Sequence, residues 1–317
     1  MTLEQGWHVG TGEGKDTTSR LKQVLEAGHF AITAEVVPPA GTEAHLLMDK
    51  ARDLHGLADA VNVTDGAGAR AHMCSLAAAA ILHEHGIEPI LQLTCRDRNR
   101  IALQSDLLGA AALGIRNLLI LRGDDPSAGD QPDAKAVFDL DSRALTETAI
   151  GIRDRKELPS GRAVQGDAPF FIGGADAPID PPADWEPKGL MAKVDAGTQF
   201  VQTQFCMDPE VVRRYTARLA DFGLTEKLYV LIGVAPLASA KSARWMKEKL
   251  FGVTIPDAIV DRMDKAGDPK AEGRAICAEL LQQLSEIPGV SGAHIMAPLN
   301  ESSIPEVIDR SGLTKRR

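Results

Sequence analysis

Polar residues that could carry chemistry stand where apolar runs of the sequence end. The stretch NLLILRGDDP at 117–126 passes from apolar residues into Arg122, Gly123 and Asp124 and closes with proline. Other apolar runs end in carboxylates, hydroxyls, amides or glycines: Glu35, Thr64 with Asp65, Gln92 with Thr94, Gly173 with Gly174, and Gln204. The cations near these ends are few, namely Arg122 and Lys193. Such a set suits a neutral polar heterocycle better than a bare phosphate cluster.

Glu35 is the strongest single candidate for catalysis. It lies in AITAEVVPP, with apolar residues on both sides and two prolines after it. A carboxylate in an apolar wall is costly to ionise, which favours the protonated form that a general acid needs. The alternative is a strand-end carboxylate paired with a lysine.

Apolar runs alternate with helical patterns along the chain. Several runs are continuously apolar, as expected for parallel strands covered on both faces. The eight strand candidates are 30–37, 59–65, 88–95, 117–123, 169–174, 200–205, 228–234 and 292–298. Helical stretches lie at 43–57, 72–86, 97–114, 142–155, 187–197, 208–223, 238–250 and within 255–287.

This order predicts a (β/α)8 TIM barrel of the α/β class, in which the strand ends face one mouth. A doubly wound open sheet is the main rival, but it needs no eighth strand near the C-terminus, and this chain supplies one at 292–298. We expect a polar extension at 1–22 and a single barrel domain at 23–317. Two loops rich in proline, glycine and aspartate, 124–137 and 175–187, follow strand ends and are expected either to carry chemistry or to be surface insertions.

The helix expected at 97–114 has recognisable ends. Asp97 is a candidate N-cap and Gly114 a candidate stop. Its apolar side chains are Ile101, Leu103, Leu107, Leu108 and Leu113.

Composition excludes several classes of function. The net charge is −9 and the basic residues form no dense run apart from the terminal TKRR, so we expect neither a nucleic-acid nor a membrane partner. No signal-peptide core or long apolar run occurs, which indicates a cytoplasmic protein. The four cysteines are widely spaced, and neither they nor the histidines at 83 and 85 form a metal motif, so we expect reduced thiols and no metal.

The sequence resembles the methylenetetrahydrofolate reductase family from about residue 30 to 312. The resemblance rests on the order and spacing of AEVVPP, VNVTDGAGA, LQLTCRDRNR, LGIRNLLILRGD, VFDLDS, KVDAGTQFVQTQF and GAHIMAPLNE. The spellings TCRDRNR and VFDLDS are most similar to the subgroup of acetogens and other bacteria that metabolise methyl groups.

The resemblance implies a barrel that binds FAD and a tetrahydrofolate substrate, and that interconverts 5,10-methylenetetrahydrofolate and 5-methyltetrahydrofolate in one-carbon metabolism and methionine biosynthesis. Glu35 matches the family's general acid, which protonates N10 of the folate, and Asp124 matches the aspartate near the flavin and the pterin. Gln204 matches the folate-binding glutamine, and Thr64 falls where it could contact folate and flavin. The other cofactor positions implied are Gln92, Leu121, Arg122, Gly123, Phe138, Gly173, Gly174 and Lys193.

Five positions depart from the best-studied branch of that family. Gln92 replaces a histidine, Gly173 and Ala177 stand where a tyrosine and a histidine contact the cofactor, and Met246 and Ser242 replace an aromatic residue and a glutamine. These departures leave open NADH or another electron donor, a flavin-independent reductase of the same fold, and a folate-binding or electron-transfer subunit that acts only in a complex. A homo-oligomer, with or without a partner subunit that donates electrons, is also expected.

Overall fold

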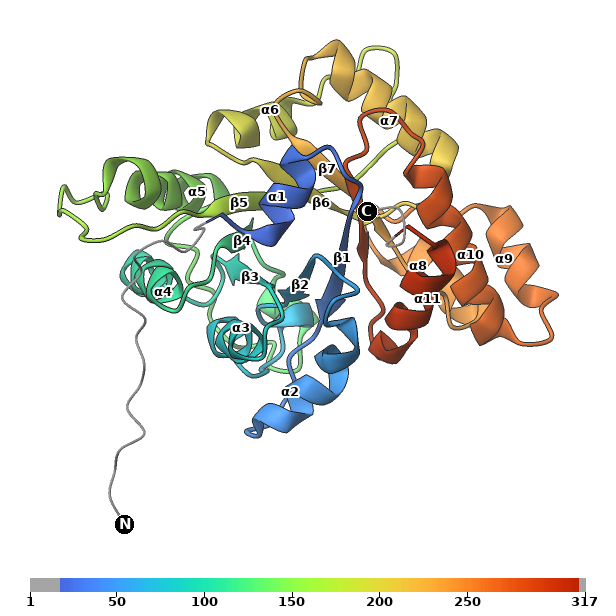
Figure 1. The fold of residues 1–317 in the computed structure, drawn as a ribbon, viewed down its shortest axis with the longest axis horizontal. Helices are drawn as coiled ribbons and strands as arrows, with labels where there is room; N and C mark the ends of the chain where they lie inside the picture. The colour runs from blue at the N-terminus through green and yellow to red at the C-terminus, as the bar shows by residue number, and fades with distance from the viewer. Residues whose placement is uncertain (1–17, 314–317) are drawn as a thin grey trace.

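The chain closes a ring of parallel strands, in which each strand pairs with the next and β8 pairs with β1 (Figure 1). The structure is a computed structural model that describes residues 18–313. Its strands are β1 (Ala31–Val36), β2 (Ala60–Val63), β3 (Pro89–Thr94), β4 (Asn117–Leu121), β5 (Phe171–Asp176), β6 (Phe200–Phe205), β7 (Tyr229–Val234) and β8 (Gly292–Ile295). The predicted TIM barrel is confirmed, and each predicted strand is present, with β5 running two residues beyond the expected 169–174 to Asp176.

Helices follow the strands around the outside of the barrel (Figure 1). They are α1 (Arg20–Glu26), α2 (Ala44–Ala51), α3 (Ser75–Glu84), α4 (Arg100–Ala112), α5 (Ser142–Ile150), α6 (Lys188–Asp195), α7 (Pro209–Asp221), α8 (Ala240–Lys249), α9 (Asp257–Asp264), α10 (Pro269–Leu284) and α11 (Ile304–Ser311). Most of the polar extension expected at 1–22 and the terminal TKRR lie outside the described residues.

The two faces of each strand serve different parts of the core. Along β1, Ile32, Ala34 and Val36 point outward and pack with the surrounding helices. The alternate residues point inward, where successive side chains form layers across the barrel. Its lowest layer is apolar and is closed by Leu21 and Leu25 of α1.

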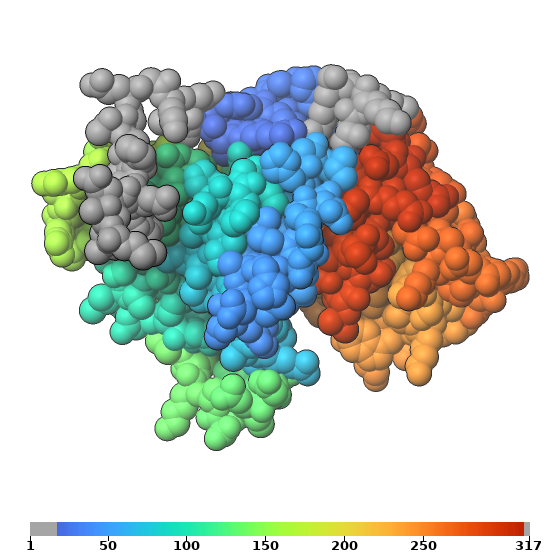
Figure 2. All heavy atoms as spheres, turned by 60° about the horizontal axis from the view of Figure 1, so that its bottom comes forward, coloured from blue at the N-terminus to red at the C-terminus, as the bar shows by residue number. Residues whose placement is uncertain are grey.

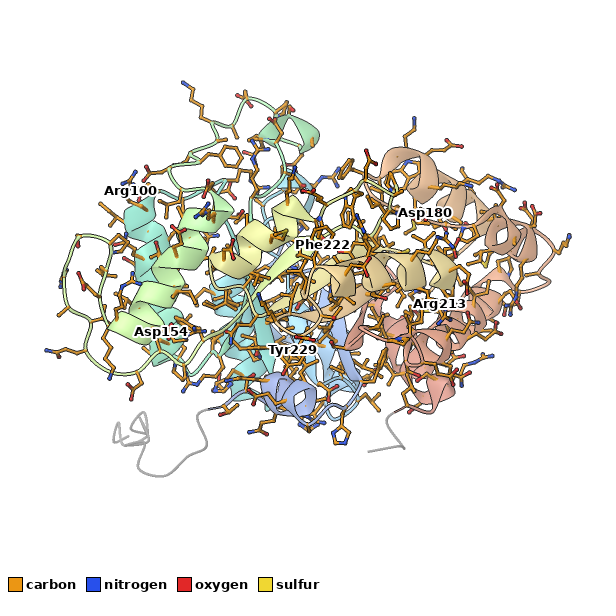
Figure 3. The ribbon with its side chains drawn as sticks, turned by 90° about the horizontal axis from the view of Figure 1, so that it is seen from above. Arg100, Asp154, Asp180, Arg213, Phe222 and Tyr229 are labelled. Carbon is orange, nitrogen blue, oxygen red and sulfur yellow. The ribbon has the colours of Figure 1, made fainter. Side chains whose placement is uncertain are left out.

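Aromatic rings fill much of that lowest layer. Phe171 and Phe200 stack with centroids 4.8 Å apart, and Tyr229 lies 6.2 Å from Phe171. Figure 3 shows Tyr229 beside α1 at this closed end. The chemistry of the barrel is therefore confined to its other end.

The amino-terminal cap of α4 differs from the expectation. Asn99, not Asp97, caps the helix: its Oδ1 accepts from the backbone N–H groups of Ile101 and Ala102, both at 3.1 Å. Asp97 instead binds Arg96. The apolar face is also narrower than predicted, since Ile101 is 71% exposed.

The end of α4 and its buried side chains agree with the pattern. Leu103 and Leu107 are fully buried. Gly114, at φ +81°, follows the last turn in the left-handed conformation that suits glycine.

Within residues 18–313, no helix has both the length and the apolar character needed to cross a bilayer. The same residues contain no group of three or more His, Cys, Asp or Glu placed to hold a metal ion.

Candidate active site

The carboxyl ends of the strands open into a hollow on the side of the molecule opposite α1. Figure 2 shows this hollow between the blue segment around α2 and the orange and red segments around α8 and α11. Residues 124–137, coloured green, project beside it. Long loops at this rim are where barrels of this class keep their chemistry.

Glu35 lies at the inner end of this mouth and is held by two side chains. Gln92 Nε2 donates a hydrogen bond of 3.2 Å to Oε2 of Glu35. His294 Nε2 lies 3.6 Å from the same oxygen. The Glu35 side chain is 16% exposed, so it is sheltered and still reaches the opening.

The expected apolar surroundings of Glu35 were wrong. Its neighbours Ala34 and Val36 point outward to the helices, because strand side chains alternate between faces. Nor does a lysine account for it: the nearby Lys50 binds Glu301 at 3.0 Å. Inside the barrel Glu35 meets polar groups.

A buried polar layer lies directly below Glu35. His294 Nδ1 is 3.0 Å from Thr33 Oγ1 and 3.3 Å from Gln202 Nε2. Gln202 Nε2 also donates to Thr33 Oγ1 at 3.0 Å, and Asn62 Nδ2 donates to Gln202 Oε1 at 2.7 Å. Each of the four residues is at most 3% exposed.

The sequence interpretation missed this layer. The available signal was a single polar residue at an inward position of an otherwise apolar run, as in AVNV of β2 and GAHI of β8. Buried polar groups of this kind are stable only when they are hydrogen-bonded to one another.

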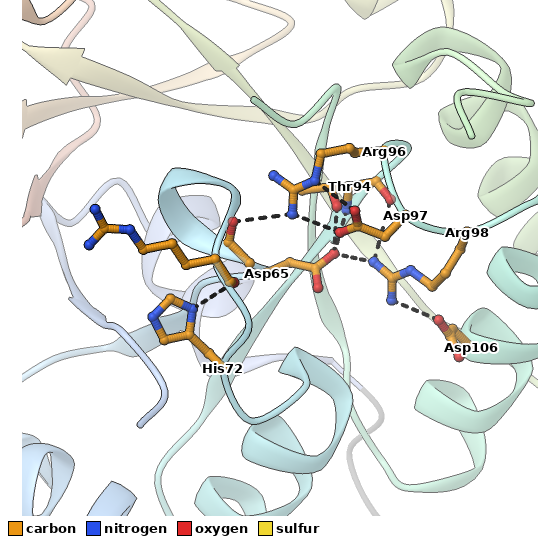
Figure 4. A network of polar contacts seen from close by, with 9 residues as sticks. Asp65, His72, Thr94, Arg96, Asp97, Arg98 and Asp106 are labelled. Carbon is orange, nitrogen blue, oxygen red and sulfur yellow. Dashed lines mark hydrogen bonds and ion pairs between the residues drawn. The ribbon is translucent and has the colours of Figure 1, made fainter. Parts of the chain in front are cut away.

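The loops after β2 and β3 are locked together by ion pairs (Figure 4). Asp65 accepts from Thr94 N at 2.8 Å and from Thr94 Oγ1 at 2.9 Å, and it also binds Arg98. Arg98 in turn binds Asp106 of α4 at 2.8 Å. Asp65 therefore braces the rim.

Arg96 extends the same network toward the loop after β4. It is 3% exposed, binds Asp97 through two hydrogen bonds of 2.7 Å and donates to Gly66 O at 3.2 Å. The pKa of Arg96 is raised, first by the hydrogen bond to Asp97 and, to a lesser degree, by the charges of Asp97, Asp124 and Asp65. Asp124 therefore lies within the electrostatic reach of this buried cation.

The loop that carries Arg122, Gly123 and Asp124 passes tightly over the end of β3. Gly123 has φ +91°, and a Cβ there would lie 3.0 Å from Arg96 Cβ and 3.1 Å from Thr94 Cβ. Glycine is therefore required by both conformation and space. Arg122 lies over the Phe138 ring at 5.0 Å, and Asp124 is exposed.

Lys193 and Gly174 lie in a second place, between the barrel wall and the helices. They line a hollow of about 170 Å³ together with Ile120 of β4 and with Ser142, Arg143 and Thr146 of α5. Lys193 Nζ binds Ala175 O and lies 4.0 Å from Asp176 Oδ1. The hollow thus offers two cations and two hydroxyls to an anionic group.

Gly173 and Gln204 are placed differently. A Cβ on Gly173 would lie 2.3 Å from the Phe200 ring, so the missing side chain is explained by packing inside the barrel. Its contact with a cofactor stays a prediction. Gln204 lies at the mouth end of β6, where its Oε1 accepts from Phe205 N at 3.0 Å and its side chain faces Gly252.

A family model described as methylenetetrahydrofolate reductase matches residues 20–312. The chain belongs to the methylenetetrahydrofolate reductase family. The predicted resemblance is confirmed, and with it the family position of the mouth just described.

Curated relatives of the methylenetetrahydrofolate reductase family match at low identity. The 5,10-methylenetetrahydrofolate reductase of Escherichia coli is 25% identical over 267 residues, covering 82% of each chain. The probable methylenetetrahydrofolate reductase (NADPH) of Caenorhabditis elegans is 27% identical over 246 residues, which are 75% of this chain and 34% of that protein. The chain thus spans about a third of the length of the nematode relative.

Solved structures show the same fold at still lower identity. DmoA from Hyphomicrobium sulfonivorans has a TM-score of 0.56 and 10% identity, covering 91% of this chain and 88% of DmoA. The EDTA monooxygenase EmoA from Chelativorans sp. BNC1 has a TM-score of 0.54 and 14% identity, covering 91% and 94%. These likenesses bear on the fold alone.

Members of the methylenetetrahydrofolate reductase family generally use a flavin, and the residues of this chain fit one. Thr64 is 4% exposed, and its hydroxyl has no hydrogen-bond partner among the described residues. Such an orphaned hydroxyl at the mouth suits a polar ring edge. The donors of the hollow at Lys193 and Arg143 suit the phosphates of a dinucleotide.

Proposed function

We propose that this protein is a flavin-dependent methylenetetrahydrofolate reductase, an oxidoreductase that interconverts 5,10-methylenetetrahydrofolate and 5-methyltetrahydrofolate. The observation that carries the proposal is the position of Glu35. A carboxyl group at the inner end of the mouth, oriented by Gln92, supplies the acid that ring opening of this folate requires. The family membership of the chain supports the same reaction.

Glu35 and Asp124 have complementary roles in this proposal. Glu35 donates its proton to N10 of the folate while the C–N10 bond breaks and a 5-iminium cation forms. The exposed carboxylate of Asp124 favours that cation electrostatically. In the oxidation of 5-methyltetrahydrofolate, Glu35 takes the proton back. Gln204 is the proposed folate ligand at the edge of the mouth.

FAD, when bound, supplies the hydride donor and acceptor. The residues proposed to hold it are Thr64, Arg122 and Gly123 at the mouth and Gly174 with Lys193 in the adjoining hollow. Gly123 lets the backbone approach a planar ring closely. The printed name of the nematode relative includes NADPH. For this chain NADH or another donor, a homo-oligomer, a partner subunit and a cytoplasmic location stay predictions.

The test is direct. Purified protein is reconstituted with FAD, freed of excess cofactor and supplied with 5,10-methylenetetrahydrofolate and NADH or NADPH, and 5-methyltetrahydrofolate is measured by chromatography. The proposal expects flavin absorbance in the protein and product that depends on it. Product formed by rigorously flavin-free protein would instead support direct hydride transfer from the nicotinamide. Folate binding without turnover by any donor would support a subunit that acts in a complex.

A further inference from the structure

The contacts of Glu35 distinguish its two oxygens. Gln92 Nε2 donates to Oε2 at 3.2 Å, and His294 Nε2 approaches the same Oε2 at 3.6 Å. Gln92 comes from β3 and His294 from β8, so the two groups reach Oε2 from different sides of the barrel. What His294 contributes depends on which ring nitrogen carries its proton.

The polar layer below His294 indicates its tautomer. Gln202 Oε1 accepts from Asn62, so the Gln202 Nε2 end is the donor that faces Thr33 Oγ1 and His294 Nδ1. Because Thr33 Oγ1 accepts that bond, its own proton is free to point at His294 Nδ1, 3.0 Å away. Nδ1 therefore meets two donors and acts as an acceptor.

The proton of a neutral His294 then sits on Nε2, the nitrogen that faces Glu35. Oε2 of Glu35 receives two N–H groups, one from Gln92 and one from His294. An oxygen that accepts two donors is the carbonyl oxygen of a protonated carboxyl group, so the acid proton is placed on Oε1.

We propose that His294 is a positioning residue that, with Gln92, directs the acid proton of Glu35 to Oε1, the oxygen left to meet N10 of the folate. This inference rests on the proposed function for the identity of the substrate. The tautomer of His294 is set by Thr33 and Gln202 and can be read without any substrate.

The first test compares His294→Gln, which can keep an N–H near the position of Nε2, with His294→Leu, which cannot. The rate measured is flavin reduction by 5-methyltetrahydrofolate in FAD-loaded protein. We expect His294→Leu to lower it by roughly 10- to 100-fold, because misplacing an acid by a fraction of an ångström has effects of this size. His294→Gln should recover most of the loss. Wild-type rates in His294→Leu would overturn the proposal.

The second test separates positioning from general damage to the barrel. If His294 acts through Glu35, His294→Leu should lower the rate no further in a Glu35→Gln background. An equal fold-loss in both backgrounds would show that the residue acts independently of Glu35 and would overturn the proposal.

A third measurement uses the wild-type protein alone. Two-bond ¹H–¹⁵N spectra of histidine-labelled protein, with the His294 signals identified by their loss in His294→Gln, should show a protonated Nε2 and an unprotonated Nδ1. The opposite tautomer would overturn the proposal. If wild-type protein does not react with folate at all, the proposed function fails, and this spectrum still decides the arrangement of the Glu35 and His294 protons.

Discussion

Gln92 and Glu35 meet inside the barrel although β2 separates their strands, with Gln92 Nε2 donating to Glu35 Oε2 at 3.2 Å. The contact forms because inward side chains at the same height converge on the barrel axis. It gives the carboxyl group a fixed direction at the mouth. The function proposed for Glu35 depends on this fixed carboxyl.

Replacing Glu35 with Gln should remove the acid and leave the fold intact. The amide has nearly the same shape, so we expect normal flavin content and a normal urea midpoint. Folate turnover should fall by roughly 10²- to 10⁴-fold, the usual contribution of a general acid. Glu84→Gln, at an exposed position at the end of α3, is the matched control and should behave as wild type. Full turnover in Glu35→Gln would rule out this residue as the acid.

Replacing Asp124 with Asn tests the charge at the mouth. Asp124 is exposed, so the variant should fold normally, while it should react with folate at least about tenfold more slowly because the iminium cation loses a nearby negative charge. Asp125→Asn is the control: the neighbouring carboxylate binds Ser127, which lowers the pKa of Asp125. Rapid-mixing rates of flavin reduction measure the difference. Equal rates in the two variants would remove Asp124 from the mechanism.

Adjacent glycines in β5 should respond in opposite ways to alanine. A Cβ on Gly173 would stand 2.3 to 2.7 Å from three atoms of the Phe200 ring, which cannot move away in a packed barrel. We expect Gly173→Ala to lower the free energy of unfolding by about 1–3 kcal/mol. In Gly174→Ala the nearest atom would be 3.6 Å away, an ordinary contact, so its stability should stay close to wild type. Urea unfolding curves measure both, and similar midpoints would contradict the packing role of Gly173.

The cysteines should differ sharply in reactivity with pH. Burial raises the pKa of the Cys95 thiol to about 11 and that of Cys206 to about 11, and burial also raises the pKa of Cys277. Because the thiolate is the nucleophile, these three should stay unreactive at pH 8 in native protein, whereas exposed Cys74 reacts. Thiol titration should therefore count one cysteine in native protein and all four in urea. Fast labelling of a second native thiol at pH 8 would contradict this burial.

The sequence was sufficient to predict the barrel and the strand ends at its mouth. Strands such as β3 and β7 are continuously apolar on their outer face, and the order of strands and helices leaves few topologies. The helix start at Asn99 could not be assigned in the same way. Asp97 and Asn99 both suit an N-cap, and the choice depends on Arg96, which takes Asp97 as its own partner.

The polar layer under Glu35 was beyond the sequence for a related reason. Thr33 and His294 are 261 residues apart, and Asn62 and Gln202 are 140 apart. Their contacts depend on the height of each strand in the closed barrel, which local patterns do not specify. The packing of Gly173 against Phe200 likewise requires the register of β5 and β6.

The central claim is that this protein exchanges hydride between a flavin and folate at the mouth that holds Glu35. Anaerobic titration of FAD-loaded protein with 5-methyltetrahydrofolate tests it most directly, with absorption spectra recorded after each addition. We predict that the long-wavelength flavin band bleaches in the wild-type protein and bleaches far more slowly in Glu35→Gln. A flavin band that persists in wild-type protein at saturating 5-methyltetrahydrofolate would contradict the claim.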